Sequence, residues 1–278
     1  MGRTSAAKAN LQYAKGLARA FGGALLFSLP LLMTMEMWWL GGFSMDRSRL
    51  LIFLLVSLPM LLGLSYFSGF EPTFRFLDEV LDALAALAVG FILAAAFLGL
   101  FGVLNAKHGL AELVGKVALA AVPAAIGALV AGKQFAGAPD GDQPHEKPVR
   151  YPGELFLMAV GAVFLAFNVA PTEEMLVIGY MMGPWHGVLL ILASIVLLHG
   201  FVYSLGFPGQ DTRRASGGFR RTFMTFTLPG YAIALLVSLY TLWTFGRLDG
   251  VALHEQATMT VVLGFPAALG AATARLVI

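Results

Sequence analysis

The amino-acid sequence predicts an all-α membrane protein with about eight transmembrane helices, arranged as two parallel four-helix repeats. Three observations support this prediction: the composition, the number of long apolar segments and a set of matches between the two halves. Of the 278 residues, 58% are hydrophobic and 12% are charged. A soluble domain has about 25% charged residues, so this chain lacks the charge that a water-facing surface needs.

Composition also narrows the chemistry. The chain contains no cysteine, which excludes disulfides and thiolate catalysis. Its net charge of +2 is too small to indicate a nucleic-acid partner, and its five histidines lack the spacing of metal ligands. The lipid bilayer is therefore the partner that the sequence indicates first, and no cofactor motif is present.

A membrane-spanning helix needs about 20 mostly apolar residues, and eight segments meet this requirement. The fifth is interrupted by Asn168, Pro171, Glu173 and Glu174, and the eighth is rich in Ala and Gly. In order, the predicted spans are 18–40, 49–69, 80–104, 109–132, 153–178, 185–207, 224–246 and 254–277. The first span ends in Trp38-Trp39 without a small-residue cleavage site, so we interpret it as a retained helix rather than a signal peptide.

Four domains follow from these spans. A basic tail, 1–17, precedes the first repeat, 18–132, and a linker rich in Pro, Gly and charge, 133–152, separates it from the second repeat, 153–278. With the N-terminus inside and eight alternating spans, 13 of the 18 Lys and Arg residues lie on the inner side. This bias predicts that both termini are cytoplasmic.

The two halves match at four places in the same order, with offsets that change only by a few residues. The matched sets are Gly23, Thr34, Glu36, Met37 and Gly41 with Gly161, Thr172, Glu174, Met175 and Gly179; Gly63, Tyr66, Gly69 and Phe70 with Gly200, Tyr203, Gly206 and Phe207; Phe101, Gly102 and Leu104 with Phe245, Gly246 and Leu248; and Glu112 and Pro123–Ala128 with Glu255 and Pro266–Ala271. Loop insertions between fixed helices would leave such offsets. A repeat with an even number of spans inserts both copies in the same orientation, which predicts two parallel units.

The repeated acids are the candidate functional residues. An Asp or Glu at a helix centre costs about 2.5–3.5 kcal/mol on insertion scales, so such groups are expected to face the protein interior and bind something. We expect Glu36 and Glu174 to be cation ligands that could hold a metal ion, supplemented by Glu173, Glu112 and Glu255. The oxygen atoms of Thr34, Thr172 and Asn168 would complete a site that suits Ca²⁺, Mg²⁺ or Na⁺.

Simpler interpretations stay open for each acid. Glu36 and Glu174 could mark solvated helix ends. Glu112 could pair with Lys116 one turn later, and Glu255 could be a first-turn acid favoured by the helix dipole. His199 could relay protons, although a hydrogen bond to a neighbour is the simpler expectation.

The segment 168–174 is the best candidate for a broken helix. Pro171 removes a helical hydrogen bond and so frees a backbone carbonyl. Membrane proteins accept this where protein, water or an ion satisfies the carbonyl. Pro30 occupies a related place before Glu36, and a simple kink is the alternative in both helices.

The Leu29-Pro30 and Thr34-x-Glu36-Met37-Trp38 end of the first span and Asn168-x-x-Pro171-Thr172-Glu173-Glu174 in the fifth resemble a family of bacterial integral membrane proteins of unknown function. The resemblance covers most of the chain and implies a multi-pass protein of the bacterial inner membrane. It brings no activity with it.

The sequence favours transport of small cations or protons, by a channel or a cation/proton exchanger, through a carboxylate-lined site between the two repeats. The alternatives are a membrane scaffold or sensor that transports nothing and an intramembrane enzyme with paired Glu as acid and base. No nucleophile or phosphate loop accompanies the acids, so we expect no enzyme. Ala and Gly in the eighth span leave a homo-oligomer open.

Overall fold

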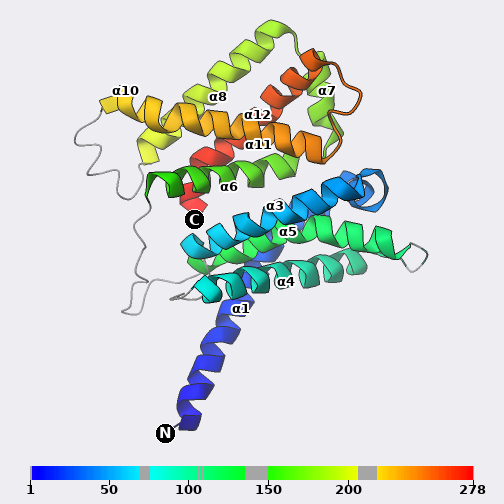
Figure 1. Ribbon diagram of the computed structural model, residues 1–278, viewed down its shortest axis with the longest axis vertical. Coiled ribbons are helices and arrows are strands. Elements are labelled where there is room, and N and C mark those ends of the chain that lie inside the picture. Colours follow the sequence, from blue (N-terminus) through cyan, green and yellow to red (C-terminus); the bar gives the residue numbers. More distant parts are fainter. Residues whose placement is uncertain are drawn as a thin grey trace. The chain divides into compact units, whose positions relative to one another are not determined.

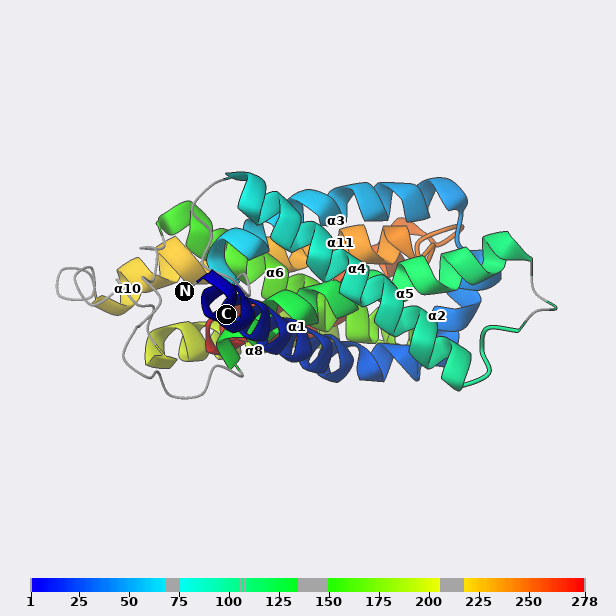
Figure 2. The ribbon, with the colours of Figure 1, turned by 90° about the horizontal axis from the view of Figure 1, so that it is seen from below.

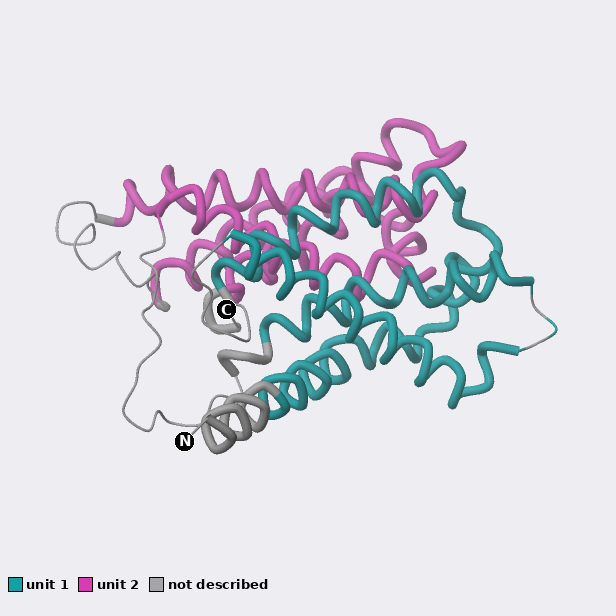
Figure 3. The backbone as a smooth tube through the Cα atoms, turned by 60° about the horizontal axis from the view of Figure 1, so that its bottom comes forward, with its two compact units in different colours: residues 1–146, 278 teal, residues 147–277 magenta. Residues whose placement is uncertain are grey.

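The computed structural model describes residues 2–68, 76–105, 107, 109–134, 150–205 and 218–277. Every regular element within these ranges is a helix. The chain forms two compact units, one of residues 1–146 with 278 and one of residues 147–277 (Figure 3). Most of the predicted linker, residues 135–149, lies outside the described residues.

Eight helices in the described residues are long and apolar enough to cross a membrane, which confirms the prediction of an all-α membrane protein with about eight spans. They are Ala14–Leu32, Arg47–Phe67, Phe76–Leu100, Leu110–Val130, Tyr151–Val169, Pro184–Ser204, Phe219–Thr244 and Leu253–Ala274. Each overlaps one of the eight predicted spans. The prediction worked because an apolar run of this length has few alternatives to a spanning helix.

Unit 1 is organised around its last helix. Its elements are α1 (Gly2–Leu32), α2 (Met35–Trp39), the π-helix η1 (Leu40–Ser44), α3 (Arg47–Ser68), α4 (Phe76–Leu100) and α5 (Leu110–Gln134). The helices α1, α3 and α4 and the segment η1 all pack on α5 (Figures 1 and 2). Ala and Gly dominate α5, and its residues 118–130 are buried throughout. Small side chains therefore make α5 the centre of the unit, because they let neighbouring backbones approach it closely.

Unit 2 has the same kind of centre. Its elements are α6 (Tyr151–Val169), α7 (Glu173–Met181), α8 (Pro184–Leu205), α10 (Gly218–Thr222), the π-helix η2 (Phe223–Thr227), α11 (Leu228–Thr244) and α12 (Leu253–Val277). The helices α6, α7, α8 and α11 pack on α12 (Figure 1). In each unit, the last helix, α5 or α12, is thus the one on which the other helices pack.

Glycines set the crossing of the first and last helix in each unit. A Cβ on Gly127 of α5 would lie 2.6 Å from the carbonyl oxygen of Gly23 in α1. In unit 2, a Cβ on Gly270 of α12 would collide with the carbonyl oxygen of Gly161 in α6, and the reverse is also true. These are the glycines that matched between the two halves of the sequence.

The first helix of each unit is interrupted at the matched threonine. Thr34 separates α1 from α2 and has an extended backbone, φ −91° and ψ 116°. Thr172 separates α6 from α7 with φ −71° and ψ 145°. The break predicted at 168–174 is therefore confirmed. The prediction of one continuous span over 18–40 was wrong, because α1 ends at Leu32 and Thr34 has an extended backbone. The N–H of Thr34 donates to the carbonyl of Leu31, so the last turn of α1 closes there.

The third helix of each unit ends in the same way. Gly102 after α4 and Gly246 after α11 have φ of 74° and 70°, a conformation that glycine adopts without steric cost. The N–H of Val103 then donates to the carbonyl of Leu98, and the N–H of Arg247 to that of Leu242, each at 2.9 Å. This pairing closes a helix end, and it places Arg247 just beyond the end of α11. The second sequence match lies partly outside the described residues, at 69–70 and 206–207.

The start of α3 is fixed by Asp46. Its Oδ1 accepts hydrogen bonds from the backbone N–H of Ser48 at 2.7 Å and from the Ser48 hydroxyl at 2.6 Å. These bonds satisfy an N–H that the first turn of a helix would otherwise leave free. They also hold the pKa of Asp46 below its usual value, because they stabilise the carboxylate.

The glycine crossing in unit 2 can be tested by substitution. Gly270→Ala should lower the free energy of unfolding by about 1–3 kcal/mol, because its Cβ meets backbone rather than a movable side chain. Gly200→Ala is the control, since nothing lies within 4 Å of its Cβ. Thermal unfolding of the two variants in detergent measures the difference. Equal midpoints for both would contradict the crossing.

Candidate functional site

The polar side chains at the two breaks bond to their own helices. The hydroxyl of Thr34 donates to the carbonyl of Pro30 at 2.6 Å, and that of Thr172 to the carbonyl of Val169 at 2.7 Å. The side-chain amide of Asn168 donates to the carbonyl of Phe164, also at 2.7 Å. These three residues, predicted as ion ligands, therefore each donate a hydrogen bond to local backbone.

Each break also leaves a carbonyl that a more distant side chain satisfies. In unit 1, the indole Nε1 of Trp38 donates to the carbonyl of Leu32 at 2.8 Å. In unit 2, the guanidinium of Arg247 donates to the carbonyl of Pro171. This carbonyl is exposed by the break at Thr172. It is not the carbonyl four residues earlier that the missing N–H of Pro171 frees, so the prediction of a freed carbonyl stays a prediction. Neither donor was predicted, because nothing in the local sequence places Trp38 or Arg247 against a break.

The acids of the Thr-x-Glu-Met match lie in the first turns of the short helices α2 and α7. Glu36 is half-buried, whereas Glu173 and Glu174 are exposed. Within the described ranges, no three His, Cys, Asp or Glu side chains are grouped so that they could hold a metal ion. A metal site on Glu36 and Glu174 stays a prediction.

Glu112 takes part in a buried ion pair. The Nζ of Lys116 lies 2.6 Å from Oε1 of Glu112, and the two side chains are 5% and 12% exposed. Both residues belong to α5 and stand one turn apart, as the simpler interpretation of Glu112 supposed. The ammonium of Lys116 thus occupies the place of a cation at this carboxylate.

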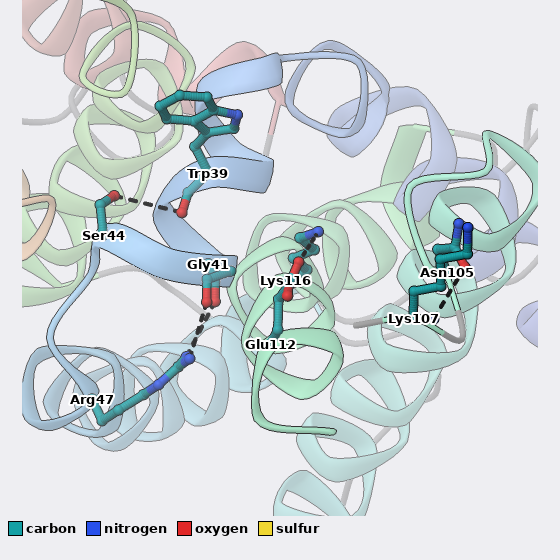
Figure 4. A network of polar contacts seen from close by, with 9 residues as sticks. Trp39, Gly41, Ser44, Arg47, Asn105, Lys107, Glu112 and Lys116 are labelled. Carbon is teal, nitrogen blue, oxygen red and sulfur yellow. Dashed lines mark hydrogen bonds and ion pairs between the residues drawn. The ribbon is translucent and has the colours of Figure 1, made fainter. Parts of the chain in front are cut away.

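The segment η1 forms the wall against which this pair lies (Figure 4). A Cβ on Gly42 would lie 2.8 Å from Cε of Lys116 and 3.2 Å from Cγ of Glu112, so a larger residue at position 42 would have to displace the end of the Lys116 side chain. Arg47 donates to the carbonyls of Gly41 and Gly42 at 3.2 Å and 3.1 Å. We call these five residues, Gly41, Gly42, Arg47, Glu112 and Lys116, the η1 network.

The corresponding place in unit 2 carries the acid without the lysine. A Cβ on Gly179 of α7 would lie 2.7 Å from Cγ of Met259, just as a Cβ on Gly41 would lie 2.8 Å from Cα of Lys116. Met259 is fully buried. Glu255, one turn before it, is half-buried, and its Oε2 is buried without a hydrogen-bond partner among the described residues.

Two further hydrogen bonds join buried polar side chains, and the sequence predicted only one of them. The hydroxyl of Ser65 in α3 donates to Oδ2 of Asp82 in α4 at 3.1 Å, and Asp82 is buried. An acid inside the apolar run 80–104 was the signal that could have revealed it. In unit 2, Nδ1 of His199 lies 2.7 Å from the hydroxyl oxygen of Thr227, which confirms the expected hydrogen bond to a neighbour.

The comparison with protein families now identifies the chain. Residues 16–278 match the family described as "Putative integral membrane protein (DUF2391)". The chain belongs to this family. The resemblance noted in the sequence is thereby confirmed, and the DUF2391 family is one of unknown function. No curated protein and no solved structure matches the chain.

In this DUF2391 member, the bond across the first break can be tested through the indole. Trp38→Phe keeps the aromatic ring but removes the donor to Leu32, which should lower the free energy of unfolding by about 1–3 kcal/mol. Trp39→Phe is the matched control, because Trp39 is 63% exposed. Chemical unfolding in detergent compares them. A loss in Trp39→Phe as large as that in Trp38→Phe would contradict the role of the bond.

The ion pair of the DUF2391 member can be tested by a double-mutant cycle. Lys116→Met should cost about 3 kcal/mol of stability, because it leaves a buried carboxylate uncompensated. Lys116→Met with Glu112→Gln should recover most of this loss, since no buried charge remains. The free energies of unfolding of the four proteins give the coupling energy. Additive losses would show that the two groups do not interact.

Proposed function

We propose that the protein transports protons or other small cations across the membrane, as a channel or a cation/proton exchanger. The observation that carries the proposal is the buried Glu112–Lys116 pair in a candidate membrane span. Ionisable groups in membrane spans are costly and mark transport paths or binding sites. Replacing a buried ion pair with apolar residues is often stabilising, so a pair retained in the first two turns of the span supports a role beyond stability.

The backbone around the pair supports the same proposal. The segment η1 is a π-helix, and such segments occur frequently at functional sites. The interruptions at Thr34 and Thr172 make the first helix of each unit discontinuous. Discontinuous helices form the binding sites of many secondary transporters.

We infer further that the chain consists of two copies of one four-helix unit. The glycine crossings, the interruptions at Thr34 and Thr172 and the ends at Gly102 and Gly246 fall at matched positions in each unit. The bias of Lys and Arg supports a cytoplasmic location for both termini, in the inner membrane of a bacterium. That the acids of both copies share one site stays a prediction.

A scaffold or sensor that transports nothing is the second candidate, and one observation favours it. Thr34, Thr172 and Asn168 donate to their own backbone, and the carbonyls at Leu32 and Pro171 accept from Trp38 and Arg247. The carbonyl oxygens of Leu32 and Pro171, which could otherwise coordinate an ion, thus already accept hydrogen bonds from protein. A protein that binds a partner instead of an ion would not need to break these hydrogen bonds.

Ion flux in liposomes decides between the two. Purified protein with a pH-sensitive dye inside the liposomes should move protons under an imposed membrane potential, with parallel measurements for Na⁺ and Ca²⁺. Glu112→Gln and Lys116→Met should abolish the flux, because each removes one half of the pair. Asp249→Asn, which changes an exposed acid in the α11–α12 turn, should leave it unchanged.

Two results would contradict the proposal. Wild-type flux equal to that of protein-free liposomes would favour the scaffold. Flux that survives in Glu112→Gln and is lost in Glu36→Gln or Glu174→Gln would move the site to the Thr-x-Glu-Met acids.

A further inference from the structure

The two units differ in how completely their buried polar side chains are hydrogen-bonded. In the described part of unit 1, every buried polar side chain has a bond to a backbone carbonyl or to another side chain: Ser28, Ser57, Ser65, Asp82 and Lys116. In the described part of unit 2, three hydroxyl oxygens on α11 are buried without a hydrogen-bond partner: those of Tyr231, Tyr240 and Thr244. Buried polar groups nearly always have a partner, which is either protein or ordered water.

The hydroxyl of Tyr231 lies where three helices of unit 2 meet. It faces Ser194 in α8 without the geometry of a hydrogen bond, and Ser194 donates its own hydrogen to the carbonyl of Leu190 at 2.7 Å. On the side of α12, a Cβ on Gly264 would lie 4.0 Å from the same hydroxyl. Tyr231 is 6% exposed and Ser194 is 1% exposed, so bulk water does not supply the partner.

A second pair of hydroxyls lies near the other end of α11. Thr244 is fully buried, and its side chain faces the hydroxyl of Tyr240 one turn earlier, again without the geometry of a hydrogen bond. Between the two pairs, Ser238 and Thr241 are also fully buried, and they donate to backbone carbonyls one turn earlier at 2.7 Å and 2.6 Å. Buried hydroxyl groups thus occur along about 20 Å of α11, from Tyr231 to Thr244.

Water is the ligand that fits two hydroxyl groups that face each other without bonding. A water molecule both donates and accepts hydrogen bonds, so one molecule between the two groups satisfies both. A metal ion does not fit, because the described residues contain no group of three His, Cys, Asp or Glu side chains that could hold one. Neutral hydroxyl groups also do not compensate the charge of a buried cation.

We propose that unit 2 binds ordered water molecules within its helix packing, one between Tyr231 and Ser194 and one between Tyr240 and Thr244. The proposal goes beyond the proposed function and does not depend on it, because it involves neither the Glu112–Lys116 pair nor a transported ion. It assigns the buried hydroxyl groups of α11 a common role. The buried polar side chains described in unit 1 need no such water, since protein already satisfies them.

Radiolytic labelling tests this without any measurement of transport. X-ray pulses split water into hydroxyl radicals where the water lies, and these radicals oxidise the side chains in contact with it, which peptide mass spectrometry detects. In the purified full-length protein, Tyr231 and Tyr240 should be oxidised severalfold faster than Phe53, a buried aromatic residue of α3 that is 2% exposed. Radicals generated from peroxide in the bulk solution should not oxidise Tyr231 at this rate, because it is buried.

Substitutions show which groups hold each water molecule. Ser194→Ala should lower the oxidation rate of Tyr231 severalfold and leave that of Tyr240 unchanged, and Thr244→Val should have the opposite effect. Ser204→Ala is the matched control, because Ser204 also lies on α8 but is exposed. It should change neither rate.

Three results would overturn the proposal. Oxidation of both tyrosines as slow as that of Phe53 would show that no water lies beside them. Rates that stay unchanged in Ser194→Ala and Thr244→Val would show that these hydroxyl groups do not hold it. Rapid oxidation of Tyr231 by bulk radicals would show an open route for solvent instead of enclosed molecules. Absence of ion flux in the liposomes would leave the expected rates as they are, so a failure of the proposed function is distinguishable from a failure of the water sites.

Discussion

The structure depends on satisfying the backbone carbonyls that its helix interruptions expose. In an apolar environment each unsatisfied carbonyl costs several kcal/mol, so a membrane helix cannot be broken without a donor at hand. Here the donors are side chains: Trp38 for Leu32, Arg247 for Pro171, and Arg47 for Gly41 and Gly42. The positions of α2, η1 and α7 follow from these bonds as much as from hydrophobic packing.

These donors also determine the electrostatics of the interruptions. A carbonyl that could bind an ion instead accepts from an arginine or an indole, and a carboxylate that could bind an ion instead binds the ammonium of Lys116. The charged side chains of Arg247 and Lys116 thus lie at oxygen acceptors that could otherwise attract external cations.

The two units make similar glycine contacts and differ in the side chains beside them. Close glycine contacts fix the first helix against the last in each, at Gly23 with Gly127 and at Gly161 with Gly270. These contacts involve backbone atoms, so they restrict the main chain and leave nearby side chains free to differ. Lys116 beside Gly41 and Met259 beside Gly179 are such a difference, since one side chain is charged and the other is apolar.

The sequence by itself determined the eight spans, the interruption at 168–174 and the spacing that pairs Glu112 with Lys116. These features depend on apolar run length, on proline and on neighbours one helical turn apart, all of which act within a single helix. Only the tertiary structure decided that the first helix also breaks at Thr34, that Lys116 is buried against Gly42 and that Arg247 reaches Pro171. The last contact joins residues 76 positions apart, and its partners meet because α11 ends at Thr244, just before Gly246, while α6 and α11 pack together. The local sequence does not predict such a contact, because the contact results from the packing of whole helices.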